Sequence, residues 1–156
     1  MAIRNGAKAI IIDNGKILLD HNFHSTLGEY YSLPGGGQHK YESMADAVVR
    51  ECLEETGYTV VPERLAALSE EIYTSDVMRT QHSEYAHGIL HIFICTLADV
   101  PKQAPTEQDA GQCGCKWIEL SQLDTLTLWP TYLPAHMDQI INGGAPVFLG
   151  THLIDL

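Results

Sequence analysis

The segment GGQHKYESMADAVVRECLEETGY, residues 36–58, places four glutamates, two glycines and one arginine at fixed offsets. Its spacing is G-x5-E-x7-R-E-C-L-E-E-T-G-Y. The fixed positions are Gly36, Glu42, Arg50, Glu51, Glu54, Glu55 and Gly57. Hard divalent cations such as Mg²⁺ prefer carboxylate oxygens together with the oxygens of substrate phosphates. The segment therefore predicts a site that holds a divalent metal against a phosphate chain.

Helix signals frame most of this segment. Ser43 is a suitable N-cap with Asp46 three residues on, which is typical of a capping box. Gly57 follows as a natural C′ residue. The expected apolar face consists of Ala45, Val48, Val49, Cys52 and Thr56.

Three carboxylates of the helix are expected on the flank of this apolar face. Glu51 and Glu55 lie one turn apart with Glu54 beside them. Their repulsion destabilises an isolated helix by a few tenths of a kcal/mol per pair, roughly. Bound metal offsets that repulsion, and Arg50 offers a second counter-charge with Glu42 as its partner. A solvated acidic face is the alternative for these three glutamates taken alone.

The preceding residues favour the metal site over the solvated face. Residues 30–33 are expected to form a short strand that Pro34 ends, and Gly35, Gly36 and Gly37 follow. A strand, a glycine turn and a helix bring bare backbone close to the carboxylates. An ordinary tight turn is the alternative for any one of these glycines.

The spacing matches the Nudix box G-x5-E-x7-R-E-U-x-E-E-x-G-U, in which U is a bulky apolar residue, here Cys52 and Tyr58. The chain therefore resembles the Nudix hydrolases. The resemblance implies an α/β (α+β) fold, a Nudix-type α/β/α sandwich with a mixed sheet, as one domain over residues 1–156. It also implies hydrolysis of the pyrophosphate bond of a nucleoside diphosphate linked to another moiety, with Mg²⁺ or Mn²⁺ as cofactor.

The resemblance assigns roles within the box. Glu51, Glu54 and Glu55 are expected to bind metal, together with a backbone carbonyl of Gly35 or Gly36, and Glu51 or Glu54 doubles as general base. Arg50 orients the carboxylates. Glu42 is either an outer metal ligand or, as we favour, the anchor of Arg50.

Further candidates lie outside the box. Many relatives add an acidic residue from a loop, for which Glu107 is the candidate and Asp109 the reserve, and a solvated loop carboxylate is the alternative. The substrate is expected to contact Gly35, Gly36, Gly37 and Tyr31, with Tyr30, Phe23 and Tyr73 as further stacking candidates and Arg4 and Lys8 as phosphate candidates. Core packing and surface positions are the alternatives for these side chains.

The substrate stays open among ADP-ribose-like compounds, dinucleoside polyphosphates and nucleoside triphosphates. Tyr73, 15 residues beyond Tyr58, is a weak sign of dinucleoside polyphosphates in this family. Two rival interpretations are a non-catalytic Nudix-like module that senses a nucleotide and a structural metal protein. The intact set of carboxylates argues against the first.

Length, charge and composition argue against two classes of protein, non-specific nucleic-acid binders and membrane-spanning proteins. The length of 156 residues suits one domain, and the net charge of −11 argues against non-specific nucleic-acid binding. No apolar stretch is long enough to span a membrane. Lys8 interrupts the first apolar run and Asp13 ends it, so no signal-peptide pattern is expected and a cytoplasmic location is predicted. The oligomeric state stays open, with a homodimer as one alternative.

The four cysteines give no strong metal signal. Cys52 and Cys95 are expected in the core as free thiols, whereas Cys113 and Cys115 lack a second pair at zinc-like spacing.

The remaining elements are predicted from local patterns along the chain. Residues 7–12 and 17–21 are expected to form a hairpin, followed by a loop at 22–29, and residues 58–61 and 65–73 are expected to be extended. A loop is predicted at 74–84, strands at 89–97 and 116–120 around a loop at 99–114, and a helix at 130–141.

Overall fold

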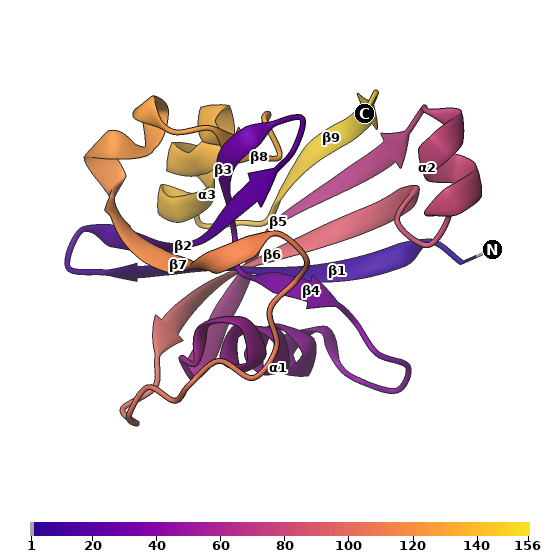
Figure 1. Cartoon of the computed structure of the whole chain (residues 1–156). Coiled ribbons are helices and arrows are strands. Elements are labelled where there is room, and N and C mark those ends of the chain that lie inside the picture. Colours follow the sequence, from indigo (N-terminus) through magenta and orange to yellow (C-terminus); the bar gives the residue numbers. More distant parts are fainter. Residues whose placement is uncertain (1) are drawn as a thin grey trace.

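The fold is a curled mixed sheet between helices, and the computed structural model describes residues 2–156 (Figure 1). The strands are Arg4–Asp13 (β1), Lys16–His24 (β2), Gly28–Ser32 (β3), Gly35–Gly37 (β4), Val60–Tyr73 (β5), His87–Leu97 (β6), Gln112–Glu119 (β7), Leu128–Trp129 (β8) and Val147–Ile154 (β9). The helices are Met44–Thr56 (α1), Asp76–Gln81 (α2) and Met137–Asn142 (α3), with 3-10 turns at Leu120–Thr125 (η1) and Pro134–His136 (η2).

Strand β1 lies at the centre of the sheet. The strand order is β8-β3-β2-β1-β6-β5-β9, with β4 paired to β1 and β7 paired to β2. β1 runs antiparallel to β2 and β4 but parallel to β6. Helix α1 covers one side and α3 lies on the other (Figure 1). The predicted α/β sandwich with a mixed sheet is therefore confirmed.

Successive side chains of β1 pack alternately into two separate hydrophobic cores. Ala7, Ala9 and Ile11 pack under α1, whereas Ile10 packs in the core on the α3 side. Because side chains alternate along a strand, Lys8 shares its face with Ile10. The same strand thus supports both the helix that carries the glutamates and the opposite face of the sheet.

Helix α1 has the ends that its sequence predicts. The side chain of Ser43 accepts a hydrogen bond from the Asp46 amide at 3.0 Å, and Gly57 ends the helix with a φ of +77°. The predicted apolar face is wrong at Ala45, which is exposed, while Ala47 is buried. The core therefore lies slightly to one side of the expected stripe.

The glycines before the helix form a strand. β4 pairs with β1 in the register Gly37 to Gly6, Gly36 to Ala7 and Gly35 to Lys8. Gly35 has a φ of +133°, and a Cβ there would lie 2.0 Å from the Ala7 carbonyl oxygen. The predicted glycine turn between strand and helix is therefore wrong: the glycines form a strand, and glycine is needed because the backbone packs tightly against β1.

Several other boundaries differ from the sequence-based prediction. Residues 22–29 belong mostly to β2 and β3, and the polar segment 74–84 contains α2, whose N-cap Ser75 accepts from the Met78 amide. The helix expected over 130–141 is confined to η2 and α3, and β9 was not predicted. These elements depend on pairing and packing with distant strands, which local patterns do not reveal. No helix among residues 2–156 is long and apolar enough to cross a membrane.

Replacing Gly57 by alanine is expected to destabilise the protein more than the same change at Gly15. Both glycines have a left-handed φ, +77° and +76°, and that conformation costs alanine about 1–2 kcal/mol. Of the two, only a Cβ at Gly57 also meets backbone, 1.9 Å from the Gln103 carbonyl oxygen, whereas no atom of residues 2–156 beyond its chain neighbours lies within 4 Å of a Cβ at Gly15. Urea denaturation of both variants measures the difference, and equal losses of unfolding free energy would contradict the close contact at Gly57.

Candidate active site

Arg50 ties the glycine strand to the glutamates of α1. Its Nε and Nη2 donate to the two carboxylate oxygens of Glu42 at 2.7 and 3.0 Å. Its Nη1 donates to Glu51 at 2.8 Å and to Glu54 at 3.1 Å. Nη2 also donates to the Gly37 carbonyl at 2.9 Å. The predicted Glu42–Arg50 pair is confirmed, and one guanidinium joins three carboxylates to the backbone of β4.

The pair is electrostatically tight. The hydrogen bonds from Arg50 hold the pKa of the Glu42 carboxyl at about 2, and the same contact raises the pKa of Arg50. Both side chains are largely buried, with 22% of Arg50 and 15% of Glu42 exposed. Because the pKa of Glu42 lies far below neutral and that of Arg50 far above it, both groups stay charged across the neutral pH range.

A hollow of about 310 Å³ opens beside this network, and we call it the acidic hollow. Its lining residues are Arg4, Gly36, Gly37, His39, Arg50, Glu51, Glu54, Glu107 and Asp109. The structure thus brings together Arg50, Glu51, Glu54 and both loop candidates, Glu107 and Asp109. The Glu51 carboxylate lies against bare backbone, because a Cβ on Gly36 would stand 2.4 Å from its Oε2.

The loop that carries Glu107 is fastened to the C-terminal end of α1. The amides of Thr106 and Glu107 both donate to the Glu54 carbonyl, at 2.9 and 3.0 Å, and the Gln103 amide donates to the Gly57 carbonyl at 2.8 Å. Carbonyls in the last turn of a helix have no partner within the helix. Here they bind the loop, which places Glu107 at the acidic hollow.

Glu55 departs from the prediction that all three helix glutamates share one face. It is only 4% exposed, and it accepts a hydrogen bond from the Gly35 amide at 2.9 Å. It lines a different cavity together with Lys8 and Asp20. Burial raises the pKa of Glu55, with Lys8 opposing the shift and Asp20 adding to it. Its assignment as a metal ligand stays a prediction, and its observed contact is with the glycine strand.

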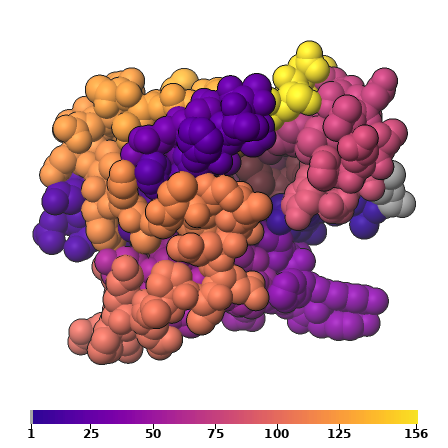
Figure 2. All heavy atoms as spheres, in the orientation of Figure 1, coloured from indigo at the N-terminus to yellow at the C-terminus, as the bar shows by residue number. Residues whose placement is uncertain are grey.

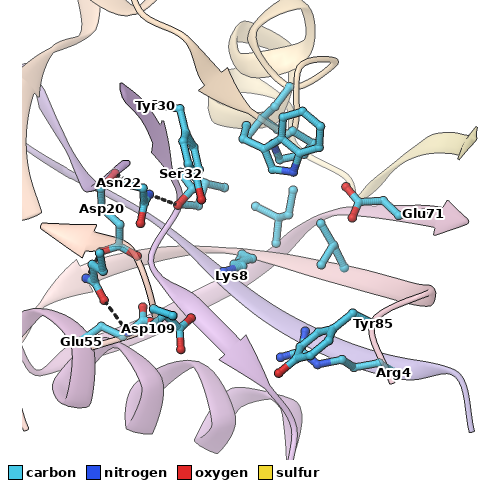
Figure 3. A pocket seen from close by; sticks show the side chains of 18 of the residues that line it. Arg4, Lys8, Asp20, Asn22, Tyr30, Ser32, Glu55, Glu71, Tyr85 and Asp109 are labelled. Atoms are coloured by element: carbon cyan, nitrogen blue, oxygen red, sulfur yellow. Dashed lines mark hydrogen bonds between the residues drawn. The ribbon is translucent and has the colours of Figure 1, made fainter. Parts of the chain in front are cut away.

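The second cavity, of about 340 Å³, is the central pocket (Figure 3). It is lined by Arg4, Lys8, Asp20, Asn22, Tyr30, Ser32, Leu33, Glu55, Glu71, Tyr73, Tyr85, Leu90, Ile92, Asp109, Ala110, Gln112, Trp129, Pro130 and Leu133. The space-filling view shows a recess between the α2 side and the residues near 110 (Figure 2). The central pocket and the acidic hollow share Arg4 and Asp109. The two cavities are therefore neighbours in the structure.

The walls of the central pocket differ in chemistry. On one side Asn22 donates to Ser32 Oγ at 2.9 Å, and Gln112 donates to Asp20 at 3.2 Å. Burial raises the pKa of Asp20. Aromatic side chains supply other parts of the lining, namely Tyr30, Tyr73 and Trp129.

The predicted binding residues divide into two groups. Tyr30 and Tyr73 line the central pocket, as do Arg4 and Lys8. Tyr31 does not, because its ring is buried in the core and stacked on His21 with centroids 5.1 Å apart. Its assignment to substrate binding is therefore not supported by its position. Phe23 is exposed and lines neither cavity.

Sequence reasoning missed Asp20, Asn22, Gln112 and Trp129. Asp20 directly follows the buried Leu18 and Leu19 in β2, and a carboxylate at the end of an apolar run was a usable signal. Asn22 was missed because residues 22–29 were predicted to be a loop, whereas Asn22 lies on β2. Trp129 lies on β8, a strand of two residues. No local pattern marks such a strand.

The donor set fits a hard divalent cation. Glu51, Glu54, Glu107 and Asp109 offer carboxylate oxygens around one hollow, and glycine keeps the backbone beside Glu51 free of side-chain atoms. Within residues 2–156 no three His, Cys, Asp or Glu side chains stand in a preformed metal cage. Mg²⁺ usually takes only one or two carboxylates together with phosphates and waters, so the fit requires no such cage. Cys113 and Cys115 are free thiols outside this hollow.

A family comparison settles the affiliation of this site. The model of the NUDIX domain matches residues 3–139. The chain belongs to the Nudix family. The matched region contains the whole of α1, β4 and the loop that carries Glu107, so the Nudix box forms one face of the acidic hollow.

Solved structures share the fold. A NUDIX hydrolase from Nitrosomonas europaea is 20% identical, with a TM-score of 0.68 over 92% of this chain and 90% of that chain. A UDP-X diphosphatase is 21% identical, with a TM-score of 0.67 over 94% and 68%. An ADP-ribose pyrophosphatase from Streptococcus suis is 21% identical, with a TM-score of 0.63 over 94% and 99%. These likenesses show the Nudix fold, and the family match supports a Nudix pyrophosphohydrolase.

The stability that Glu42 contributes is expected to depend on pH. Its folded pKa, about 2, lies below its ordinary value of 4.5. The contribution is therefore complete above about pH 4.5 and is lost as pH falls toward 2. Urea unfolding of the native protein and of Glu42→Gln at several values between pH 7 and 3 measures it: the difference between them should shrink as pH falls.

The matched control is Glu119→Gln, which removes an exposed carboxylate 3.7 Å from Lys16. Exposed pairs contribute little, so this variant should unfold like the native protein at each pH. A difference for Glu42→Gln that stays constant over the whole pH range would contradict the tight pair with Arg50.

Proposed function

We propose that the protein hydrolyses the pyrophosphate bond of a nucleoside diphosphate linked to another moiety, with Mg²⁺ or Mn²⁺ as cofactor. The observation that carries this proposal is an acidic hollow organised by Arg50 beside an aromatic-walled pocket, the two sharing Arg4 and Asp109 in their linings. A diphosphate needs the first part and a nucleoside fits the second. The neighbours named UDP-X diphosphatase and ADP-ribose pyrophosphatase carry names of this reaction class.

Glu51 and Glu54 are the proposed metal ligands, with the Gly36 backbone beside Glu51 and with Glu107 lining the same hollow. When bound, the cation neutralises charge that builds on the phosphate oxygens and makes a water easier to deprotonate. Arg50 fixes both carboxylates through its Nη1 before substrate arrives. Such preorganisation lowers the barrier because the charged groups need not reorient during the reaction.

Proton transfer from the attacking water falls to Glu51 or Glu54, or to Glu107 from the loop. All three line the hollow, and a general base must lie within hydrogen-bond reach of that water. Glu55 has a different proposed task. By accepting from the Gly35 amide it holds β4 in place, and β4 in turn presents Gly36 and Gly37 to the hollow.

Recognition of the nucleoside is proposed for the central pocket. Tyr30 and Trp129 offer aromatic faces, while Asn22, Ser32 and Asp20 offer donors and acceptors within the same cavity. Stacking plus a few polar contacts is the usual way to orient a heteroaromatic ring.

We also propose a cytoplasmic location, which the four free cysteines support because disulfides are rare in reducing compartments.

Turnover is expected to require a divalent cation. A panel of ADP-ribose, UDP-sugars, diadenosine polyphosphates and nucleoside triphosphates should yield at least one substrate with Mg²⁺ or Mn²⁺, followed by chromatography of the products. EDTA should abolish that turnover, since the carboxylates alone cannot neutralise the phosphate charge. Turnover that survives complete chelation would refute the proposal.

Matched variants separate chemistry from folding. Glu51→Gln and Glu54→Gln keep the side-chain shape and should reduce kcat/KM by about 10²-fold or more, with little change in Tm. Glu119→Gln removes the same charge on β7, outside both cavities, and should leave kcat/KM unchanged. Full activity of both hollow variants would show that these carboxylates take no part.

A further inference from the structure

Arg4 stands where the two cavities meet. It is one of two residues, with Asp109, that line both the acidic hollow and the central pocket. Its guanidinium carbon lies 5.0 Å from the centre of the Tyr85 ring, and the two side chains lie together at the lower edge of the pocket (Figure 3). A cation over an aromatic face is held in place while its N–H groups stay available.

Glycine at position 37 makes room for this guanidinium. A Cβ on Gly37 would lie 2.9 Å from Nη2 of Arg4 and 3.2 Å from its Nε. The Arg4 side chain is therefore packed between the Tyr85 ring and the backbone of β4. The carbonyl oxygen of Gly37 accepts a hydrogen bond from Arg50, so the guanidinium groups of Arg4 and Arg50 both lie against this glycine of the acidic hollow.

Arg4 differs from Arg50 and Lys8 in having no hydrogen-bond acceptor within the described part of the chain. Among residues 2–156 its side chain makes no hydrogen bond and no ion pair, although four carboxylates line the same hollow. Arg50, in contrast, makes five hydrogen bonds. Lys8 donates to the Gly35 carbonyl. Of these three cations, only Arg4 has neither a hydrogen bond nor an ion pair with any residue that the structure describes, and its recorded contact is with the Tyr85 ring.

We infer that Arg4 binds the diphosphate of the substrate at the junction of the two cavities. The guanidinium fork matches phosphate oxygens in a bidentate manner. A diphosphate whose reacting phosphate lies in the acidic hollow and whose nucleoside lies in the central pocket passes this junction. Tyr85 holds the fork in position, so less side-chain entropy is lost on binding. This inference rests on the proposed function for its choice of ligand.

Direct binding of a non-hydrolysable diphosphate tests Arg4 without turnover. Isothermal titration of methylenediphosphonate with Mg²⁺ should give a Kd for Arg4→Gln that is about 10-fold to 100-fold weaker than for the native protein, the range expected for charge-assisted hydrogen bonds. Arg4→Gln should lower Tm only slightly, because among residues 2–156 the side chain has no hydrogen bond or ion pair to lose and gives up only its packing on Tyr85. Arg4→Lys should recover only part of the affinity, since it retains charge but not the fork.

Control variants locate the effect. Lys16→Gln removes a cation near the β1–β2 turn, at the far end of β1 from Arg4, and should bind the probe like the native protein. Tyr85→Leu should weaken binding in part, whereas Tyr85→Phe keeps the aromatic face and should not. If Arg4→Gln and Lys16→Gln have the native Kd, or if the native protein does not bind the probe at all, the inference is overturned.

The outcomes for Arg4 and for the proposed function are separable. Probe binding that depends on Arg4, without turnover of any nucleotide, would support the diphosphate site and refute the proposed hydrolysis. Metal-dependent turnover in which Arg4→Gln retains the native KM and kcat would refute the role of Arg4 and leave the hydrolysis standing.

Discussion

The guanidinium of Arg50 is the contact on which the site depends. Glutamates one turn apart on a helix repel each other, and α1 places Glu51 and Glu54 together at one hollow. Arg50 offsets that repulsion with hydrogen bonds to both, and it reaches across to Glu42 and the Gly37 carbonyl. A lysine has no planar fork to serve these directions at once. The helix, the glycine strand and the segment between them therefore share one anchor.

Much of this arrangement follows from the sequence because its causes are local. The N-cap at Ser43, the left-handed Gly57 and the one-turn spacing of the glutamates are properties of a single helix. The Glu42–Arg50 pair is also close in sequence, at a separation of eight residues. The spacing of the box further identified the family, and with it the mixed sheet between helices.

What the sequence did not show depends on distant segments. Glu55 was expected beside Glu51 and Glu54, yet its side chain is buried and accepts a hydrogen bond from the amide of Gly35, 20 residues away in sequence. Gly35, Gly36 and Gly37 were expected to form a turn, but they pair with β1 and form a strand. The central pocket joins residues of β2, β3, β6 and β8, and the register of such strands is set by pairing across the whole sheet.

The most direct test of the central claim is the coupling between Glu42 and Arg50 in catalysis. The measurement is kcat/KM for Glu42→Gln, Arg50→Lys and the double variant, with Tm recorded for each. A displacement of the carboxylates by about 1 Å can cost 10²-fold in rate, so we expect Arg50→Lys to be strongly impaired and Glu42→Gln partly so. The double variant should lose less than the sum of the two single losses, because both act on one contact. Strictly additive losses would show that the two residues act independently and would contradict the account.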